Sequence, residues 1–223
     1  MQTIGIIGGD GFIGSNLVEA LGGVSINRLN YDTHSDTLFD VIINANGNSK
    51  RYWANNNPIE DFNLSVLSVY KSLFDFKYKK YVYMSSITAE QMDGAYGFHK
   101  HLSEELVKRY CGDYSIVRLP LVIGAGSTKG VVSDILNGNT VYLTRYSRLM
   151  IIDVKEVAMR LDLLLYRDEL GELERFYPND NINIWKIGEI LGKKIKYADT
   201  TRDECYNYKG EFKSSEFYLN KCK

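Results

Sequence analysis

The sequence predicts an α/β protein built on a doubly wound parallel sheet, with helices on both faces of the sheet. Segments with strand character and segments with helix character alternate five times between residues 4 and 119. The clearest strand candidate, residues 40–45, is continuous in Val and Ile, as strands covered on both faces are. A glycine-rich turn joins the first strand candidate to the first helix candidate. These observations predict strand–helix–strand units whose strands share one sheet.

The first half of the chain supplies the strands and helices of this sheet in order. Pro58 sits where the first turn of a helix tolerates proline, and apolar residues follow every three or four positions until Leu73. The stretch between the first helix and Asp40 is too short for a full crossover, so we expect an abbreviated connection there. We predict strands at residues 4–7, 24–29, 40–45, 81–84 and 114–119, and helices at residues 12–21, 58–73 and 95–110.

The pattern loosens in the second half of the chain. Residues 131–136 and 154–165 have helical character, and residues 181–191 indicate a short extended piece that enters a helix. The last 25 residues show no clear period. We therefore expect residues 1–124 to form a dinucleotide-binding core. Residues 125–223 would form a small substrate-binding cap that is interleaved with this core.

Composition excludes several classes of protein. Among 223 residues, 27 Lys and Arg face 28 Asp and Glu, so a polybasic nucleic-acid binder and an acidic tail are both disfavoured. No apolar run approaches the ~18 residues that a membrane helix needs, and the amino terminus does not resemble a signal peptide. The three Cys are widely spaced and follow no metal-binding pattern. We expect a cytoplasmic protein with reduced thiols and no bound metal.

The glycine-rich turn has the spacing G-x-x-G-x-x-G, with glycines at Gly8, Gly11 and Gly14. Glycines permit a tight turn that lets backbone N–H groups approach a pyrophosphate, and the following helix adds partial positive charge at its amino end. A turn without any ligand is the alternative interpretation. The strand before the turn and the amphipathic helix after it favour dinucleotide binding.

The sequence offers two candidates for the residue that contacts the adenosine ribose. An acidic residue about 20 positions after the first glycine is typical of NAD binding, and Asp32 lies 24 residues after Gly8. Arg28 lies nearer the end of the second strand, where it could pair with a 2′-phosphate and favour NADP. Either residue could also be a solvated loop charge. The cofactor is predicted to be NAD or NADP, with Arg28 favouring NADP.

A tyrosine and a lysine share one face of the third predicted helix. Tyr96 and Lys100 are four residues apart, and a Lys ammonium beside a phenol lowers the pKa of the phenol. Spacing alone carries little weight in a chain with 17 Tyr. Ser86 ends a predicted strand ten residues earlier, at the edge where ligands bind in such sheets, and Ser85 is the alternative to it. An exposed Tyr–Lys pair with a turn-capping Ser is the competing interpretation.

Six motifs in this order resemble the extended short-chain dehydrogenase/reductase family, the NAD-dependent epimerases and dehydratases of nucleotide sugars. They are GGDGFIG (8–14), DVIINANG (40–47), NPIEDFNLSV (57–66), KKYVYMSS (79–86), YGFHK (96–100) and SIVRLPLVIGAG (115–126). The resemblance implies a Rossmann-like fold with a small substrate-binding cap after it. It also implies an NAD(P)-dependent enzyme that acts on a small nucleotide-sugar substrate.

The resemblance also assigns roles to residues. The catalytic group would be Ser86, Tyr96 and Lys100, and Tyr96 and Lys100 would also contact the cofactor. Asn63 would support Lys100 through water. The other residues that would bind the cofactor are Gly8, Gly11, Phe12, Ile13, Gly14, Ala45, Asn46, Gly47, Pro120 and Leu121. The residues that would contact the substrate are Asn48, Ser86, Arg145 and Arg148.

Departures from the family pattern reduce the number of reactions to be expected. Ile87 and Thr88 stand where the family's dehydratases carry an acidic pair, so β-elimination would lack its acid and base. We therefore expect reduction of a keto group of a nucleotide-linked sugar, with Tyr96 as the proton donor. The alternatives are a nucleotide-sugar epimerase, a reductase of a non-sugar carbonyl and a non-catalytic protein that senses a dinucleotide.

The expected partners follow from the same patterns. The helices that begin near Pro58 and Ala95 carry more apolar residues than one core-facing stripe needs, which favours a homodimer. The cap is short for a bulky substrate, so a partner subunit could help to close the site. No nucleic acid and no membrane is expected as a partner.

Overall fold

The computed structural model describes residues 2–222, which form two compact units. The first unit contains the chain up to Leu119 together with Ala158–Arg175. The second unit contains Pro120–Val157 and the residues from Phe176 onward. The chain therefore leaves the first unit after Leu119, passes through the second, and returns to the first before its carboxyl-terminal part.

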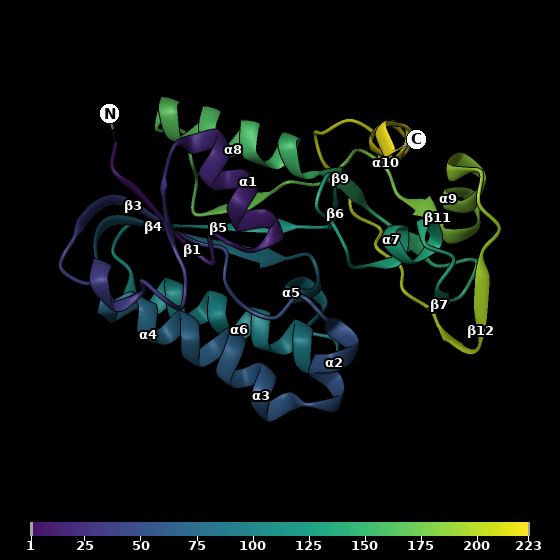
Figure 1. Cartoon of the computed structure of the whole chain (residues 1–223), viewed down its shortest axis with the longest axis horizontal. Coiled ribbons are helices and arrows are strands. Elements are labelled where there is room, and N and C mark those ends of the chain that lie inside the picture. The colour runs from purple at the N-terminus through teal and green to yellow at the C-terminus, as the bar shows by residue number, and fades with distance from the viewer. Residues whose placement is uncertain (1, 223) are drawn as a thin grey trace. The chain divides into compact units, whose positions relative to one another are not determined.

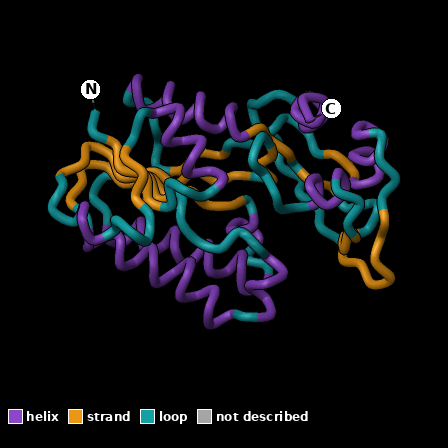
Figure 2. The backbone as a smooth tube through the Cα atoms, in the orientation of Figure 1, coloured by secondary structure: helices purple, strands orange, loops and turns teal. Residues whose placement is uncertain are grey.

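The first unit is built on a six-stranded sheet in which every strand pair is parallel. The strand order is β10-β5-β4-β3-β1-β2, and its inner strands are buried by helices on both faces (Figures 1 and 2). Ile6, Ile43 and Val82 have no exposed surface, as the runs of Val and Ile predicted. The prediction of a doubly wound parallel sheet is confirmed. Its strands are β1 (Ile4–Ile7), β2 (Val24–Ile26), β3 (Leu38–Asn44), β4 (Lys77–Ser86), β5 (Tyr114–Leu119) and β10 (Leu173–Arg175).

Two layers of helices cover the sheet. Figure 1 shows α1 and α8 on one face, and α3, α4 and α6 on the other. The connection from β2 to β3 is only the single-turn 3₁₀ helix η1 (Asp32–His34), so the predicted abbreviated crossover is confirmed. The α-helices in this unit are α1 (Phe12–Leu21), α2 (Arg51–Asn56), α3 (Pro58–Phe62), α4 (Ser68–Asp75), α5 (Thr88–Gln91), α6 (Gly94–Tyr110) and most of α8 (Val154–Arg167).

The helix predicted at residues 58–73 is interrupted by a π-helical turn. The turn, η2 (Asn63–Leu67), separates α3 from α4. A π turn contains one more residue per hydrogen-bonded ring than an α-helix, and such turns are frequent at functional sites. It buries Ser65 and Val66 and leaves Asn63 exposed. The prediction of one continuous helix is wrong at this point.

The second unit contains three small two-stranded sheets. β6 (Leu121–Ile123) pairs with β9 (Ile151–Asp153), and β7 (Thr140–Leu143) pairs with β12 (Lys196–Arg202). β8 (Arg148–Leu149) pairs with β11 (Ile182–Asn183). The helices are α7 (Val131–Leu136), α9 (Ile184–Leu191), α10 (Ser215–Leu219) and the 3₁₀ helix η3 (Asn220–Cys222). Across residues 2–222, no helix combines the length and apolarity needed to cross a bilayer.

Because the six strands of the first unit are parallel, all of their carboxyl ends lie at one edge of the sheet. Ile7 at the end of β1 is level with Ile26 of β2 and Asn44 of β3, and Ser86 of β4 is level with Leu119 of β5. We call this the carboxyl edge, and the opposite one the amino edge. The loops that leave the carboxyl edge are those expected to bind ligands in such a sheet.

Candidate active site

The glycine-rich turn lies at the carboxyl edge and is packed too tightly for side chains. Gly8 has φ of 77°, and its N–H donates to the carbonyl of Ile26 at 2.8 Å. The N–H of Gly11 donates back to the carbonyl of Gly8 at 2.9 Å. A Cβ on Gly14 would lie 2.1 Å from that same carbonyl oxygen. Glycine is therefore required at both ends of this turn for steric reasons.

The amino end of α1 fits a pyrophosphate. The first N–H groups of an α-helix have no partner inside the helix, and here no side chain caps them. The first turn also carries no acidic residue, so nothing on the helix offsets its partial positive charge. The N-cap is Gly11, which leaves the approach open. Phe12, Ile13 and Gly14 begin the helix, so their N–H groups are the ones available to an anion.

The loop after β3 packs directly against the glycine-rich turn. A Cβ on Gly8 would lie 3.0 Å from the Cα of Asn46, and the N–H of Ala45 donates to Ile7 at 2.9 Å. The buried Asn44 accepts a hydrogen bond from the Asn46 N–H at 2.9 Å and donates to the Tyr81 hydroxyl at 2.7 Å. These contacts hold the residues expected to line a cofactor at fixed positions beside the glycine-rich turn.

The structure brings Ser86, Tyr96 and Lys100 together in the first unit. Ser86 is the last residue of β4, and its side chain forms a hydrogen bond with that of Tyr96, which lies in the first turn of α6. Lys100, one turn further along α6, is buried. Its Nζ donates to the carbonyl of Met84 at 3.5 Å and lies 5.1 Å from the centre of the Tyr83 ring. Ser86 and Lys100 thus both lie close enough to Tyr96 to influence its phenol.

Burial decides the protonation of Tyr96. It raises the pKa of the phenol above its ordinary value of 10.0 and is the largest influence. The Lys100 charge lowers the pKa in the predicted direction, as does the hydrogen bond with Ser86, while Tyr83 and Asp61 raise it. The net shift is upward, so the phenol is protonated at neutral pH and is suited to donate a proton.

Ser85 is committed to a different role from Ser86. Its Oγ donates to Glu104 Oε1 at 2.5 Å, and Glu104 is completely buried. The Arg118 guanidinium binds both oxygens of Glu104, at 2.9 and 2.6 Å, and also contacts Glu90 at 3.1 Å. This network joins β4, β5 and α6 in the layer beneath the site. Ser86 remains as the serine that can face a ligand.

A second buried network was missed in the sequence. Asp61 on α3 is completely buried, and its Oδ2 lies 2.7 Å from Nδ1 of His99 on α6. Asn48 Nδ2 and Ser65 Oγ donate to Asp61 Oδ1 at 2.8 and 3.3 Å. The only sequence signal was a histidine next to Lys100, which predicts no partner by itself.

Two polar residues of the π turn, Asn63 and Ser65, differ in burial. Asn63 is exposed on the π turn, whereas Ser65 is the buried polar residue of that turn. A Cβ on Gly47 would lie 3.6 Å from both Lys100 Nζ and Ser65 Oγ, so these groups flank the same loop. Ser65 is thus the polar side chain of the π turn that lies at this loop, and the support of Lys100 by Asn63 stays a prediction.

The remaining predicted residues lie in exposed turns or in the second unit. Arg28 is exposed in the turn after β2, and Asp32 is exposed at the start of η1. Pro120 is buried, and Leu121 begins β6. Arg145 stacks on Tyr146 with 5.4 Å between guanidinium carbon and ring centre. Arg148 lies in β8 opposite Asn183.

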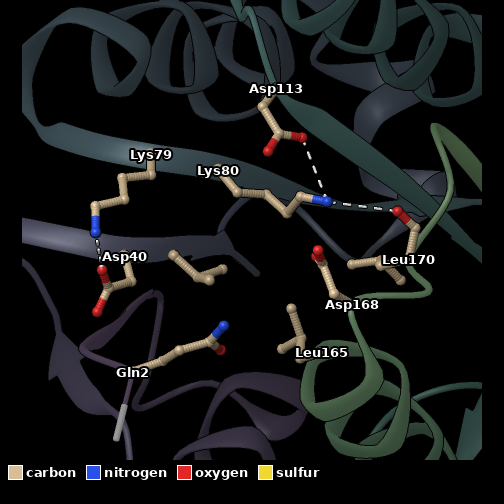
Figure 3. Close-up of a pocket in the computed structure, with 9 residues that line it drawn as sticks. Gln2, Asp40, Lys79, Lys80, Asp113, Leu165, Asp168 and Leu170 are labelled. Carbon is tan, nitrogen blue, oxygen red and sulfur yellow. Dashed lines mark hydrogen bonds and ion pairs between the residues drawn. The ribbon is translucent and has the colours of Figure 1, made fainter.

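A hollow of about 390 Å³ lies at the other edge of the sheet of the first unit (Figure 3). Two lysines of β4 line it, and each is paired with an acidic residue. Lys79 Nζ lies 2.7 Å from Asp40, and Lys80 Nζ lies 3.3 Å from Asp113 and 3.4 Å from the carbonyl of Leu170. Because both of its lysines are paired with carboxylates, the hollow offers a ligand no free cation among the described residues, and it is not the candidate active site.

Comparisons with known proteins agree with this geometry at the level of the fold. No protein-family model and no curated protein matches the sequence. A UDP-N-acetylglucosamine 4-epimerase from Methanobrevibacter ruminantium M1, in complex with UDP-N-acetylmuramic acid, is 16% identical over 98% of this chain and 96% of its own, with a TM-score of 0.77. A dTDP-4-dehydrorhamnose reductase from Bacillus anthracis str. Ames, in complex with NADP, is 14% identical over 99% and 96%, with a TM-score of 0.80.

A third solved structure is a NAD-dependent NDP-hexosamine 5,6-dehydratase involved in tunicamycin biosynthesis. It is 16% identical over 95% of this chain and 88% of its own, with a TM-score of 0.81. All three structures are enzymes of the extended short-chain dehydrogenase/reductase family, which act on nucleotide sugars. The chain has their fold.

Proposed function

We propose that the protein is an NAD(P)-dependent oxidoreductase that reduces a keto group of a nucleotide-linked sugar. The observation that carries this proposal is the grouping of Ser86, Tyr96 and Lys100 at the carboxyl edge. The uncapped amino end of α1 lies at the same edge and suits the pyrophosphate of a dinucleotide. The similar solved structures, which include enzymes with NAD or NADP chemistry in their descriptions, support the assignment.

Each of the three side chains has a distinct part in the proposed reaction. When bound, a reduced nicotinamide would supply the hydride for the carbonyl carbon and would itself be oxidised. Tyr96 donates its phenolic proton to the carbonyl oxygen, so that a C–H and an O–H bond form and the product is an alcohol. Ser86 donates a hydrogen bond to the same oxygen and orients it. Lys100 stabilises the phenolate left on Tyr96 and can hydrogen-bond to ribose hydroxyls.

The proposed reduction needs Tyr96 only as a proton donor, and the raised pKa of its phenol suits that role. An epimerase on the same site, which needs the phenol to take a proton and then return one, is the alternative. Elimination is disfavoured because Ile87 is buried and apolar and the Thr88 hydroxyl donates to Ser86 at 3.0 Å.

We propose cofactor or substrate contacts for the other predicted site residues of each unit. Phe12, Ile13 and the loop from Ala45 to Gly47 would hold the cofactor, and Asn48 would begin the substrate side. Four residues of the second unit remain proposals for the nicotinamide and the substrate. They are Pro120, Leu121, Arg145 and Arg148.

The test is a reductase assay against a panel of nucleoside-diphosphate 4-keto sugars, with NADH and NADPH consumption as the readout. The wild type should oxidise one reduced cofactor, and Tyr96→Phe should lose roughly 10²- to 10⁴-fold in kcat. Tyr52→Phe is the matched control, because Tyr52 is 77% exposed. Undiminished turnover by Tyr96→Phe would remove Tyr96 as the proton donor. Cofactor binding without turnover on any carbonyl would instead favour a dinucleotide-sensing protein.

We also propose a homodimer formed through the outer surface of α3, η2, α4 and α6. Large apolar side chains are exposed there, and a surface of this kind commonly marks an interface. These residues are Ile59, Phe62, Leu64, Leu67, Phe74, Phe98 and Tyr110. Light scattering should give twice the mass of the chain, and the double substitution Ile59→Lys, Phe62→Lys should give the mass of one chain. A monomeric wild type at micromolar concentration would contradict the proposal.

A further inference from the structure

The glycine-rich turn carries one charged side chain, and that side chain reaches toward β2. Asp10 lies between Gly9 and Gly11, and both of its carboxylate oxygens accept hydrogen bonds. Ser25 Oγ donates to Oδ1 at 3.0 Å, and Asn27 Nδ2 donates to Oδ2 at 2.7 Å. Ser25 lies in β2, and Asn27 is the first residue after it. Asp10 therefore places a carboxylate at the carboxyl end of β2.

The carboxyl end of β2 is where the adenosine ribose lies in sheets of this type, and an acidic side chain there reads the 2′-hydroxyl. In this chain the residue at that position is the neutral Asn27. Its Oδ1 accepts hydrogen bonds from the backbone of Leu29 and Asn30, at 2.9 and 3.3 Å. The amide nitrogen is consequently the part of Asn27 that points to Asp10. The acidic group at this end of β2 comes from the glycine-rich turn.

The Asp10 carboxylate is held in place by close packing. A Cβ on Gly9 would lie 2.3 Å from Ser25 Oγ, so the turn and β2 are in direct contact. Asp10 nevertheless remains exposed, and each carboxylate oxygen can accept more than one hydrogen bond. A fixed, exposed carboxylate can accept hydrogen bonds from ribose hydroxyls. It repels a phosphate, because both groups are anionic and neither can donate.

We propose that Asp10 determines cofactor choice, and that the protein binds NAD in preference to NADP. The inference rests on the proposed dinucleotide function of this turn. Arg28, which favoured NADP in the sequence, is exposed in the turn that follows Asn27. Both side chains are exposed, but the Asp10 carboxylate is anchored by two hydrogen bonds. Asp10 is thus the stronger of the two opposing determinants.

The experiment is isothermal titration calorimetry of the full chain with NAD⁺ and with NADP⁺, without substrate. The wild type should bind NAD⁺ at least about 10-fold more tightly than NADP⁺. Asp10→Ala should weaken NAD⁺ and strengthen NADP⁺, so that the ratio of the two dissociation constants falls to about one or inverts. Asp10→Asn, which keeps the size of the side chain, should shift the ratio in the same direction and guards against a folding defect in Asp10→Ala.

Ser25→Ala tests whether the anchoring of Asp10 matters. It removes one of the two hydrogen bonds to the carboxylate but keeps the charge, so the ratio of the two dissociation constants should shift in the same direction as in Asp10→Ala, by a smaller factor. If Asp10→Ala weakens both cofactors equally, Asp10 only supports the turn and the inference is overturned. A wild type that prefers NADP⁺ overturns it as well. If neither cofactor binds the wild type, the proposed function itself fails.

Discussion

The amino edge and the carboxyl edge of the sheet in the first unit both collect charged and polar side chains, but they use them differently. At the amino edge, the cations of Lys79 and Lys80 are paired with the carboxylates of Asp40 and Asp113, around the hollow shown in Figure 3. At the carboxyl edge, the buried Lys100 ammonium contacts a carbonyl oxygen and an aromatic face, neither of which cancels its charge. Among residues 2–222, no ion pair involves Lys100.

The difference shows that an open volume is a poor guide to the site in this molecule. The hollow at the amino edge has room for a small molecule, but both of its lysines are already paired with carboxylates. The carboxyl edge offers an uncapped helix end, a protonated phenol and a buried cation at fixed positions. Charged and polar groups that no neighbouring side chain neutralises indicate a functional site better than the volume of a hollow does.

The largest effect on activity is expected from replacing Lys100, whose charge no carboxylate among the described residues neutralises. Lys100→Met should lower kcat/KM roughly 10²- to 10⁴-fold, because the phenolate formed on Tyr96 loses its stabilising charge. Reduction requires protonated Tyr96, so the rate falls as pH rises through the pKa of Tyr96. Since Lys100 lowers that pKa, its loss should move the alkaline fall to higher pH. The pH profile of kcat/KM measures this shift.

Lys79→Met is the matched change at the amino edge. It removes a paired, largely exposed lysine, so kcat/KM should stay within twofold of wild type. If the two variants lose activity to the same extent, the distinction between the edges fails.

The buried network beneath the site should matter next. Glu104→Gln leaves Arg118 without its bidentate partner, and breaking a buried ion pair in this way costs about 3–5 kcal/mol. Urea unfolding should show this loss in the free energy of unfolding. Glu105→Gln breaks an exposed pair with Lys108 on the same helix, and should cost no more than about 0.5 kcal/mol. Equal losses in both variants would mean that burial of Glu104 is not the cause.

The next largest effect is expected from adding a side chain within the glycine-rich turn. Gly14→Ala would place a Cβ 2.1 Å from the Gly8 carbonyl, so the turn must shift, and a displacement of about 1 Å can cost ~10²-fold in rate. Calorimetry with the dinucleotide should show weaker binding as well. Gly112→Ala is the control, since nothing lies within 4 Å of the added atom. Unchanged binding by Gly14→Ala would argue against the pyrophosphate site.

The smallest effect is expected from the amino edge itself. Asp40→Asn should leave kcat/KM unchanged but lower the unfolding temperature slightly at neutral pH. Hydrogen bonds from Lys79 and Thr3 hold the pKa of Asp40 well below its ordinary value of 3.8. A carboxylate of this kind stabilises the fold above pH 3.8, and that contribution is lost as pH falls through the lowered pKa. Thermal scans should therefore show the two proteins converging as the pH falls below 3.8.

Local patterns in the sequence predicted most of the first unit. The runs of Val and Ile, the glycine-rich turn and the stripe after Pro58 each reflect a local preference, and those elements were found within a few residues. β10 was not predicted, because Leu173–Arg175 is short and two of its three residues are charged. Its strand conformation depends on pairing with β5, which is distant in the sequence.

The same limit applies to the candidate site. Ser86, Tyr96 and Lys100 were found because two of them share a helix face and the third ends a strand. Asp61 and His99 are 38 residues apart, and no local sequence pattern predicts their pairing. Burial of Tyr96, which outweighs the charge of Lys100, is likewise a property of the folded chain. The sequence therefore predicted which three residues form the candidate site, but not the surroundings that shift the pKa of Tyr96.

The π turn at Asn63–Leu67 sets the rotation of α3 relative to α4 about their common helix axis. One residue fewer would restore an unbroken α-helix and rotate α3 against α4 by about 100°. Asp61 would then swing away from His99, and the hydrogen bond that ties Asn48 to Asp61 would be lost with it. The length of this turn, and not only the identity of its residues, is thus part of what the candidate site requires.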